Sequence, residues 1–265
     1  MTSLDRVAIV TGAGTGIGRA IAQVLAESGI ACVAMGRRTE PLAETAASPG
    51  LAAEIVPVTG DITSRDDRER VVKETLARFG RIDILVNNAG ISGRAPILEY
   101  SEEDWRQVMA INVDGGFFLA QAVARNMRER SWGRIVNIAS VYGSLGLNAS
   151  LYAGLFPMED LGAGPTRQPA YHTSKGAVLN MTRDLAVALA PWKITVNAIS
   201  PGMFLTEQSR PTVSDEVVRR LSEMTPLGRF GEVREIGYAV RFLVSDDAAF
   251  ITGTELRVDG GWSIW

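Results

Sequence analysis

The sequence has few of the residues that build metal sites, disulfides or histidine-dependent active sites. Its 265 residues include one cysteine, Cys32, and one histidine, His172. A single cysteine cannot form an internal disulfide, and the apolar neighbours of Cys32 in ACVAM predict an ordinary core residue in a buried strand. One histidine and one cysteine are too few for a nitrogen or sulfur metal site, and a Ser-His-Asp triad would depend on His172 alone. We therefore expect no metal centre, and interpret His172 as a helix residue beside more important groups.

Long apolar runs and clusters of one charge are also missing. No stretch approaches the length of about 18 uninterrupted apolar residues that a membrane-spanning helix needs, and MTSLDRVAIV lacks the features of a secretory signal. The net charge of −3, without a cluster of Lys and Arg, gives no surface for a phosphate backbone. The sequence therefore predicts a cytoplasmic protein that binds neither membranes nor nucleic acid.

Short apolar runs rich in β-branched residues recur along the chain, at 7–10, 32–35, 54–58, 82–86, 134–139, 194–199 and 255–258. Because these runs are apolar without clear alternation, they predict strands of a parallel sheet that is covered on both faces. Helical patterns alternate with them, at 17–28, 64–79, 102–129, 170–190, 214–224 and 232–244. The alternation predicts an α/β fold: a doubly wound, Rossmann-like, seven-stranded parallel sheet flanked by helices, with sites at the carboxyl ends of the strands.

One segment does not fit the alternating pattern. Residues 141–169 are rich in Gly, Pro and Leu and lack a sustained period, and they are too many for an ordinary connection. We expect a single catalytic domain, 1–265, with a substrate lid inserted at 141–169. The alternative is an insertion that packs on a neighbouring subunit and never meets substrate.

A glycine-rich turn follows the first predicted strand. In TGAGTGIGRA, Gly12, Gly14, Gly16 and Gly18 precede an apolar helix. Glycines at such a place let the backbone approach a pyrophosphate at a helix N-terminus, where N–H groups and the helix dipole favour an anion. The turn therefore indicates a nucleotide-binding loop, although such a turn can also serve only close packing of strand against helix.

Further motifs follow in order: NNAG at 87–90, Ser140 after the fifth strand, YHTSK at 171–175, PGMFLT at 201–206 and VDGG at 258–261. Together with the glycine turn they resemble the short-chain dehydrogenase/reductase family in its compact single-domain branch. The likeness covers nearly the whole chain and is closest to 3-oxoacyl reductase and gluconate-dehydrogenase-like members. It implies an oxidoreductase that moves hydride between a nicotinamide nucleotide and a small-molecule secondary alcohol/ketone pair.

Three tyrosines compete for the role of proton donor. A phenol, with a pKa near about 10, is a poor base at neutral pH unless a nearby cation favours the phenolate. Tyr171 has Lys175 at i+4 on the same helix face. Tyr152 lies near the family's usual distance of about a dozen residues from Ser140, but it and Tyr142 have phenylalanine and glycine at i+4. Tyr171 is therefore the predicted acid/base, and its distance from Ser140, 171 − 140 = 31 residues, predicts an insertion between them.

The resemblance implies roles for four residues. Ser140 would hydrogen-bond the substrate oxygen, Tyr171 would exchange its proton, and Lys175 would also hold the cofactor ribose. Asn112, a polar residue in VMAINVDGGFF, matches the family's helix asparagine, which supports a water relay to the lysine. A helix-kink or packing residue is the alternative for Asn112.

The end of the second strand bears on the choice of cofactor. In dinucleotide folds an acidic residue about 20 positions past the glycine loop binds a ribose 2′-hydroxyl, whereas arginine suits a 2′-phosphate. Here Gly36 occupies the place of the acid, and Arg37 and Arg38 follow it. This favours NADP(H). NAD(H) stays possible, because both arginines could form a solvated turn and Thr15 stands where some NADP-preferring relatives carry a basic residue.

The resemblance implies the other cofactor contacts. Asp61 would contact the adenine, with Ile62 packing alongside. Asn88, Ala89 and Gly90 would line the adenosine ribose side, and Pro201, Gly202 and Thr206 would lie against the nicotinamide and phosphates. The full predicted cofactor set is Gly12, Gly14, Thr15, Gly16, Ile17, Gly18, Arg37, Arg38, Asp61, Ile62, Asn88, Ala89, Gly90, Tyr171, Lys175, Pro201, Gly202 and Thr206.

Other functions on the same fold are weighed against the leading one. An NAD(H)-dependent sugar-acid or polyol dehydrogenase stays open. A catalytically silent nucleotide sensor would tend to lose the tyrosine or the lysine, halohydrin dehalogenases lack the glycine loop, and sugar-nucleotide epimerases have a longer C-terminal substrate domain. The helix at 102–129 is apolar on more than one face, which together with the family resemblance predicts a homotetramer, or a homodimer.

Overall fold

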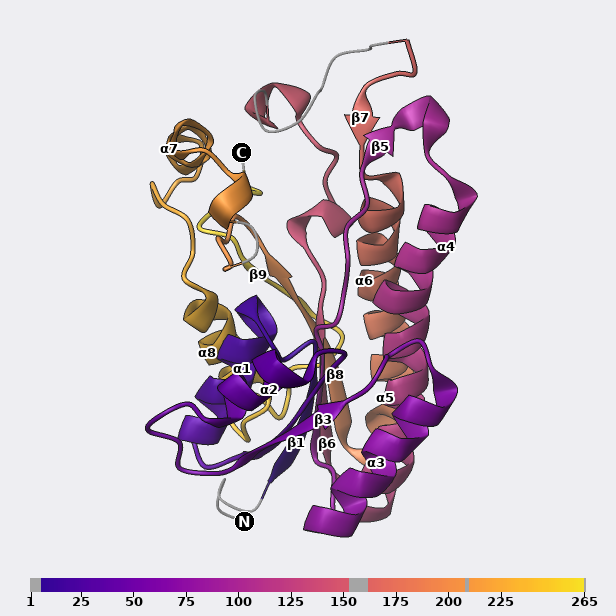
Figure 1. Ribbon diagram of the computed structural model, residues 1–265. Coiled ribbons are helices and arrows are strands. Elements are labelled where there is room, and N and C mark those ends of the chain that lie inside the picture. Colours follow the sequence, from indigo (N-terminus) through magenta and orange to yellow (C-terminus); the bar gives the residue numbers. More distant parts are fainter. Residues whose placement is uncertain (1–5, 153–161, 208–209, 265) are drawn as a thin grey trace.

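The computed structural model describes residues 6–152, 162–207 and 210–264 (Figure 1). Its main sheet has seven strands, all parallel, in the order β3-β2-β1-β4-β6-β8-β9. The strands are β1 Val7–Thr11, β2 Ala31–Gly36, β3 Ile55–Thr59, β4 Ile84–Asn87, β6 Gly133–Ile138, β8 Ile194–Pro201 and β9 Glu255–Val258. The predicted strands and the doubly wound fold are confirmed. The order reverses between β1 and β4, which is where such sheets bind ligands at their carboxyl ends.

Helices cover both faces of the sheet. Figure 1 shows α1, α2 and α8 on one face and α3, α4, α5 and α6 on the other. Their bounds are α1 Gly16–Glu27, α2 Thr39–Ala46, α3 Arg65–Phe79, α4 Glu102–Met109, α5 Gly115–Arg130, α6 Pro169–Leu189, α7 Asp215–Glu223 and α8 Val233–Leu243. The helix α2 was not predicted, because only Leu42 and Thr45 of its eight residues are buried, too few to give a periodic pattern.

Burial on both faces explains the unbroken apolar runs. Ala8 and Val10 of β1 belong to the core on the α1 and α8 side, together with Ile21 and Ile236. Ile9, between them in the chain, belongs to the core on the opposite side with residues of α5. Successive side chains of a strand point to opposite faces, so a strand covered twice has no polar positions to alternate.

The predicted helix at 102–129 is continuous but contains a π turn at Ala110–Asp114, between α4 and α5. The turn carries Asn112, which is buried. Single π turns inside α-helices are frequent at functional sites. The predicted helix is therefore confirmed, with a local irregularity that the sequence pattern did not reveal.

The inserted segment is tied to the loop after β4. It contains 3₁₀ turns at Val141–Gly143 and Ala149–Tyr152, and then the short strand β7, Thr166–Arg167, which pairs antiparallel with β5, Ala95–Pro96. Both strands lie at the end of the molecule away from the N-terminus (Figure 1). Residues 153–161 of the predicted lid lie outside the described residues, so the lid stays a prediction.

Further 3₁₀ turns occur at Ile97–Glu99, Ala190–Trp192 and Arg210–Thr212. Within the described ranges, no helix is both long enough and apolar enough to cross a membrane.

Candidate active site

Two adjoining cavities open at the carboxyl edge of the sheet. The first, here the glycine-loop cleft, has a volume of about 390 Å³ and is lined by the turn after β1, the end of β2 and the residues after β3 and β4. The second, the tyrosine cavity, has about 440 Å³ and is lined by the ends of β6 and β8 and the first turn of α6. Five residues line both: Ile17, Asn88, Gly90, Ile91 and Thr206. A ligand in one cavity therefore reaches the other.

The glycine loop owes its shape to close approaches that only glycine permits. Gly12 has φ of +65°, in the left-handed region. A Cβ on Gly18, in the first turn of α1, would lie 2.3 Å from the carbonyl oxygen of Gly12 and 2.4 Å from Nδ2 of Asn88. The helix N-terminus is thus pressed against the turn, and its backbone amides face the cleft where an anion would bind.

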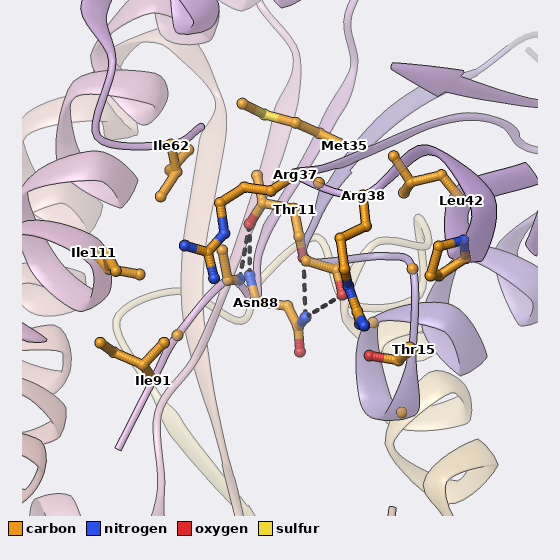
Figure 2. A pocket seen from close by; sticks show the side chains of 18 of the residues that line it. Thr11, Thr15, Met35, Arg37, Arg38, Leu42, Ile62, Asn88, Ile91 and Ile111 are labelled. Carbon is orange, nitrogen blue, oxygen red and sulfur yellow. Dashed lines mark hydrogen bonds between the residues drawn. The ribbon is translucent and has the colours of Figure 1, made fainter. Parts of the chain in front are cut away.

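Asn88 and Thr11 fasten this loop to β4. Nδ2 of Asn88 donates to the carbonyl oxygens of Thr11 at 2.9 Å and Gly12 at 3.3 Å, as Figure 2 shows. Oγ1 of Thr11 accepts from the backbone amides of Asn88 and Ala89, both at 3.0 Å. The Asn88 side chain therefore holds the loop as well as lining the cleft. Thr11 was not predicted as a site residue, although a buried threonine at a strand end is a usable signal.

The other side of the cleft carries charge. The carboxylate of Asp61 accepts hydrogen bonds from the amide and hydroxyl of Thr63 at 2.8 and 2.7 Å, and it lines the cleft beside Ile62. Arg37 and Arg38 are exposed and extend from the end of β2 over the cleft (Figure 2). Neither guanidinium forms a hydrogen bond or ion pair with another described residue, so both are available to an anionic ligand.

Apolar side chains complete the cleft. None of them was predicted as a site residue: Met35, Pro41, Leu42, Ile91 and Ile111. Figure 2 shows Ile62, Ile91 and Ile111 on one side and Leu42 on the other. A cleft with apolar walls, a helix N-terminus and two guanidinium groups that pair with no described residue suits the chemistry of a dinucleotide.

Ser140 and Tyr171 meet in the tyrosine cavity. Ser140 follows β6 and caps the turn Val141–Gly143, with its Oγ accepting from the amide of Tyr142 at 3.2 Å. Tyr171 lies in the first turn of α6, which Pro169 starts. A Cβ on Gly143 would lie 2.8 Å from the carbonyl oxygen of Lys175, so the turn packs directly on α6. This contact places Ser140 and Tyr171 in the same cavity.

The electrostatics of Tyr171 depend first on burial. Burial raises the pKa of its phenol, and the hydrogen bond with Ser140 only partly opposes that rise. Lys175 is buried with Nζ 5.7 Å from the centre of the Tyr171 ring, and it donates to the carbonyl oxygen of Ile138 at 2.7 Å. Burial lowers the pKa of Lys175 to about 8. Desolvation of the phenol therefore dominates its pKa in the protein alone, and the effect of the Lys175 ammonium on the phenolate stays a prediction.

Asn112 lies behind both cavities. Its Oδ1 accepts from the amide of Ile91 at 2.9 Å, and its Nδ2 donates to the carbonyl oxygen of Ile91 and to Oγ of Ser174, each at 2.9 Å. The side chain thus braces the segment after β4 against α6, one position before Lys175. This geometry favours a positioning role, and the water relay stays a prediction.

Aromatic residues form one wall of the tyrosine cavity. The hydroxyls of Tyr142 and Tyr152 are hydrogen-bonded to each other, and the Tyr152 hydroxyl donates to Sδ of Met203 at 3.6 Å. The ring of His172 stacks on Tyr142, with centroids 4.9 Å apart and planes 6° from parallel. Tyr142 and Tyr152 were considered only as competitors for the acid/base role, and their place in this wall was not predicted.

The last predicted residues follow β8. Pro201 and Gly202 line the tyrosine cavity, and Thr206 lies where the two cavities join, with its Cγ2 3.1 Å from the Cβ position of Gly16. Further residues of the tyrosine cavity were not predicted as site residues: Ser92, Gln168, Phe204 and Phe230. Every predicted cofactor residue lines one of the two cavities.

Two other predictions concern residues outside the cavities. Cys32 is buried, and burial raises the pKa of its thiol, as expected of a core residue. In the described part of the chain, no group of three or more His, Cys, Asp or Glu side chains has a geometry that could hold a metal ion.

Comparison with known proteins agrees with this site. A family model described as short chain dehydrogenase matches residues 6–154, and one described as enoyl-(acyl carrier protein) reductase matches residues 158–263. The chain is 38% identical to gluconate 5-dehydrogenase of Gluconobacter oxydans, covering 97% of this chain and 94% of that protein. It is 36% identical to an NAD-dependent glycerol dehydrogenase of Listeria innocua, covering 98% and 94%.

Similarity extends to solved structures. The crystal structure of levodione reductase superposes with a TM-score of 0.85 and 33% identity, and the match covers 98% of both chains. Two family models that together span nearly all of the sequence, and relatives above 30% identity over its full length, all indicate one family. The chain therefore belongs to the short-chain dehydrogenases/reductases, which are oxidoreductases acting on CH–OH or carbonyl groups.

Proposed function

We propose that the protein interconverts a ketone and a secondary alcohol with NADP(H), and that Tyr171 exchanges the proton. The observation that carries this proposal is the meeting of Ser140, Tyr171 and Lys175 in one cavity that opens into the glycine-loop cleft. When bound in that cleft, a nicotinamide nucleotide supplies or accepts the hydride.

The chain's own groups perform the proton chemistry. The Ser140 hydroxyl holds the substrate oxygen, and the phenol of Tyr171 donates its proton to that oxygen in the reductive direction. The raised pKa of Tyr171 keeps the phenol protonated at neutral pH, as a proton donor needs. Lys175, in its ammonium form, stabilises the phenolate that develops as the proton leaves.

The preference for NADP(H) is supported by the end of β2. Gly36 offers no carboxylate to a ribose 2′-hydroxyl, and the two guanidinium groups beside it form no ion pair with a described residue. A 2′-phosphate would give them a charge-assisted partner. The second candidate is an NAD(H)-dependent dehydrogenase of polyols or sugar acids, which is favoured by the names of the Listeria and Gluconobacter relatives.

Exposed aromatic side chains support the proposal of a homotetramer. Trp105 of α4 and Phe118 of α5 are exposed, and a groove between α5 and α6 is lined by Phe117 and Trp192. Exposed apolar surface on adjoining helices is typical of an interface between copies of one chain.

A turnover screen tests the function. Purified protein is incubated with NADPH or NADH and a panel of ketones, and with NADP⁺ or NAD⁺ and a panel of alcohols, while the absorbance of the reduced nicotinamide is followed. We expect oxidation of NADPH with at least one ketone. Tight nucleotide binding without turnover of any compound would favour the silent nucleotide sensor instead.

A further inference from the structure

Three aromatic residues beside the proposed proton donor have no part in the chemistry described so far. Tyr142 and Tyr152 line the tyrosine cavity together with Ser140 and Tyr171, and His172 stacks behind Tyr142. Both phenols are largely removed from water. A polar wall facing a substrate cavity is a means of choosing substrates.

The hydrogen bonds of this wall have a fixed direction. A phenol carries one proton, and that of Tyr152 is donated to Sδ of Met203 at 3.6 Å. The bond between the two phenols fits either direction, and donation by Tyr152 to Met203 selects the direction in which the Tyr152 oxygen accepts and Tyr142 donates. Burial raises the pKa of both phenols, and the shared bond adds to the rise at Tyr142 and opposes it at Tyr152, which agrees with this direction.

This direction determines what the Tyr142 hydroxyl can offer to a ligand. Its only proton is committed to Tyr152, so toward a ligand its oxygen presents lone pairs alone. Tyr142 lies two residues after Ser140, and its amide donates to the Ser140 hydroxyl at 3.2 Å. A hydrogen-bond acceptor thus sits on the same turn as the group that holds the reacting oxygen.

Charge in the cavity restricts the ligand further. Among the described residues that line the tyrosine cavity there is no Asp, Glu or Arg, and the cation Lys175 is directed at the carbonyl oxygen of Ile138. A substrate carboxylate would lose its water here without a guanidinium to replace it. The cavity therefore favours an uncharged ligand.

His172 keeps Tyr142 in place. The two rings lie 4.9 Å apart and 6° from parallel, and the His172 ring meets Tyr171 edge-on at 6.0 Å. Burial lowers the pKa of His172, so the ring stays neutral and acts by contact rather than by charge. This makes His172 a positioning residue for the acceptor on Tyr142.

Resting on the ketone–alcohol chemistry proposed above, we propose that Tyr142 selects uncharged hydroxyketones, and the corresponding polyols in the reverse direction. Its phenol oxygen accepts a hydrogen bond from a substrate hydroxyl close to the reacting carbonyl. Ser140 and Tyr171 hold the carbonyl oxygen itself.

The test compares three substrates with four carbons each: 1-hydroxybutan-2-one, butan-2-one and 2-oxobutanoate. We expect kcat/KM to be about tenfold higher for the hydroxyketone than for butan-2-one, the value of one hydrogen bond, and lowest for the keto acid. In Tyr142→Phe we expect the ratio of kcat/KM for the hydroxyketone to kcat/KM for butan-2-one to be close to one. Tyr238→Phe, at an exposed tyrosine of α8, is the matched control and leaves the ratio unchanged.

A second pair of variants tests the positioning residue. His172→Phe keeps a flat ring against Tyr142 and should retain the ratio, whereas His172→Ala should lower it, mainly by raising KM for the hydroxyketone. An unchanged ratio in Tyr142→Phe, or a preference of the parent enzyme for the keto acid, overturns the inference and leaves the proposed function standing. If neither NADPH nor NADH supports turnover of the three ketones or of any compound in the wider panel, both the inference and the proposed function are overturned.

Discussion

The glycine-loop cleft and the tyrosine cavity are neighbours of similar volume that are built in different ways. The cleft is held by backbone: Gly12 in a left-handed conformation, Gly18 against its carbonyl, and the Asn88 amide on the loop. The tyrosine cavity is held by side chains from the turn after β6, the first turn of α6 and the residues after β8. Backbone contacts restrict which residues are tolerated much more than a wall of side chains does.

The comparison separates nucleotide binding from substrate choice within one molecule. Substitutions in the cleft should disturb nucleotide binding or folding, because a Cβ there meets backbone atoms that cannot move away. Substitutions in the wall of the tyrosine cavity should instead change which carbonyl compound is used. Four variants test this division, from the largest expected effect to the smallest.

Gly18→Ala should have the largest effect. The added Cβ would lie 2.3 Å from the Gly12 carbonyl oxygen, so the loop must move away from α1. We expect a loss of about 3 kcal/mol in the free energy of unfolding and an increase of more than about tenfold in the NADPH Kd. Denaturant unfolding and nucleotide titration measure both. Gly146→Ala, where no atom lies within 4 Å of the new Cβ, is the control, and an equal loss there would contradict this explanation.

Lys175→Met should change the pH profile. Negative charge develops on Tyr171 during reduction, and the ammonium form of Lys175 favours it. With a pKa of about 8, that ammonium is present below pH 8 and lost above it, so kcat/KM for ketone reduction should fall above this pH. In Lys175→Met we expect a profile without this fall and a plateau about 100-fold lower.

Exposed Lys73 of α3 provides the matched control, Lys73→Met, which should keep the parent profile. If kcat/KM still falls above pH 8 in Lys175→Met, another group titrates in this pH range and the role given to Lys175 is wrong.

Gly36→Asp should reverse the cofactor preference. The position has an ordinary φ, and a Cβ there would lie 3.4 Å from Cδ2 of Leu42, a normal contact. The new carboxylate can accept from a ribose 2′-hydroxyl and repels a 2′-phosphate. The ratio of kcat/KM for NADPH to that for NADH should drop by about 100-fold. An unchanged ratio would show that this end of β2 does not face the ribose.

Arg37→Ala should have the smallest effect of the four. Removing one of two guanidinium groups weakens the contact with a 2′-phosphate and should narrow the NADPH preference by about tenfold. Steady-state kinetics with both nucleotides measure the change, and Arg106→Ala on exposed α4 is the control. A parent enzyme with equal kinetic efficiency for NADPH and NADH would contradict the predicted preference itself.

The difference between the two cavities also explains what the sequence could predict. Glycine spacing and the Tyr171–Lys175 pair depend on neighbours in the chain. The residues of the cleft, the place of Tyr171 and Lys175 in one cavity with Ser140, and all seven strands of the main sheet could therefore be predicted. The aromatic wall could not, because Tyr142, Tyr152 and Met203 come from three separate segments and only tertiary structure joins them.

Two further differences between the sequence-based predictions and the structure have local physical causes. The phenol of Tyr171 is desolvated by its surroundings, and i, i+4 spacing carries no information on burial, so the direction of its pKa shift was not predictable. The amide of Asn112 is engaged by Ile91, a residue 21 positions away along the chain. The π turn that holds Asn112 has the same apolar pattern as an ordinary helix.

The most direct test of the central claim compares Tyr171→Phe with Tyr152→Phe, two substitutions that remove one phenol oxygen each from the same cavity. With the best ketone and NADPH, we expect Tyr171→Phe to lower kcat by about 1000-fold, the range of a lost general acid, while nucleotide titration still shows binding. Tyr152→Phe should retain at least part of the activity. An inactive Tyr152→Phe beside an active Tyr171→Phe would contradict the account.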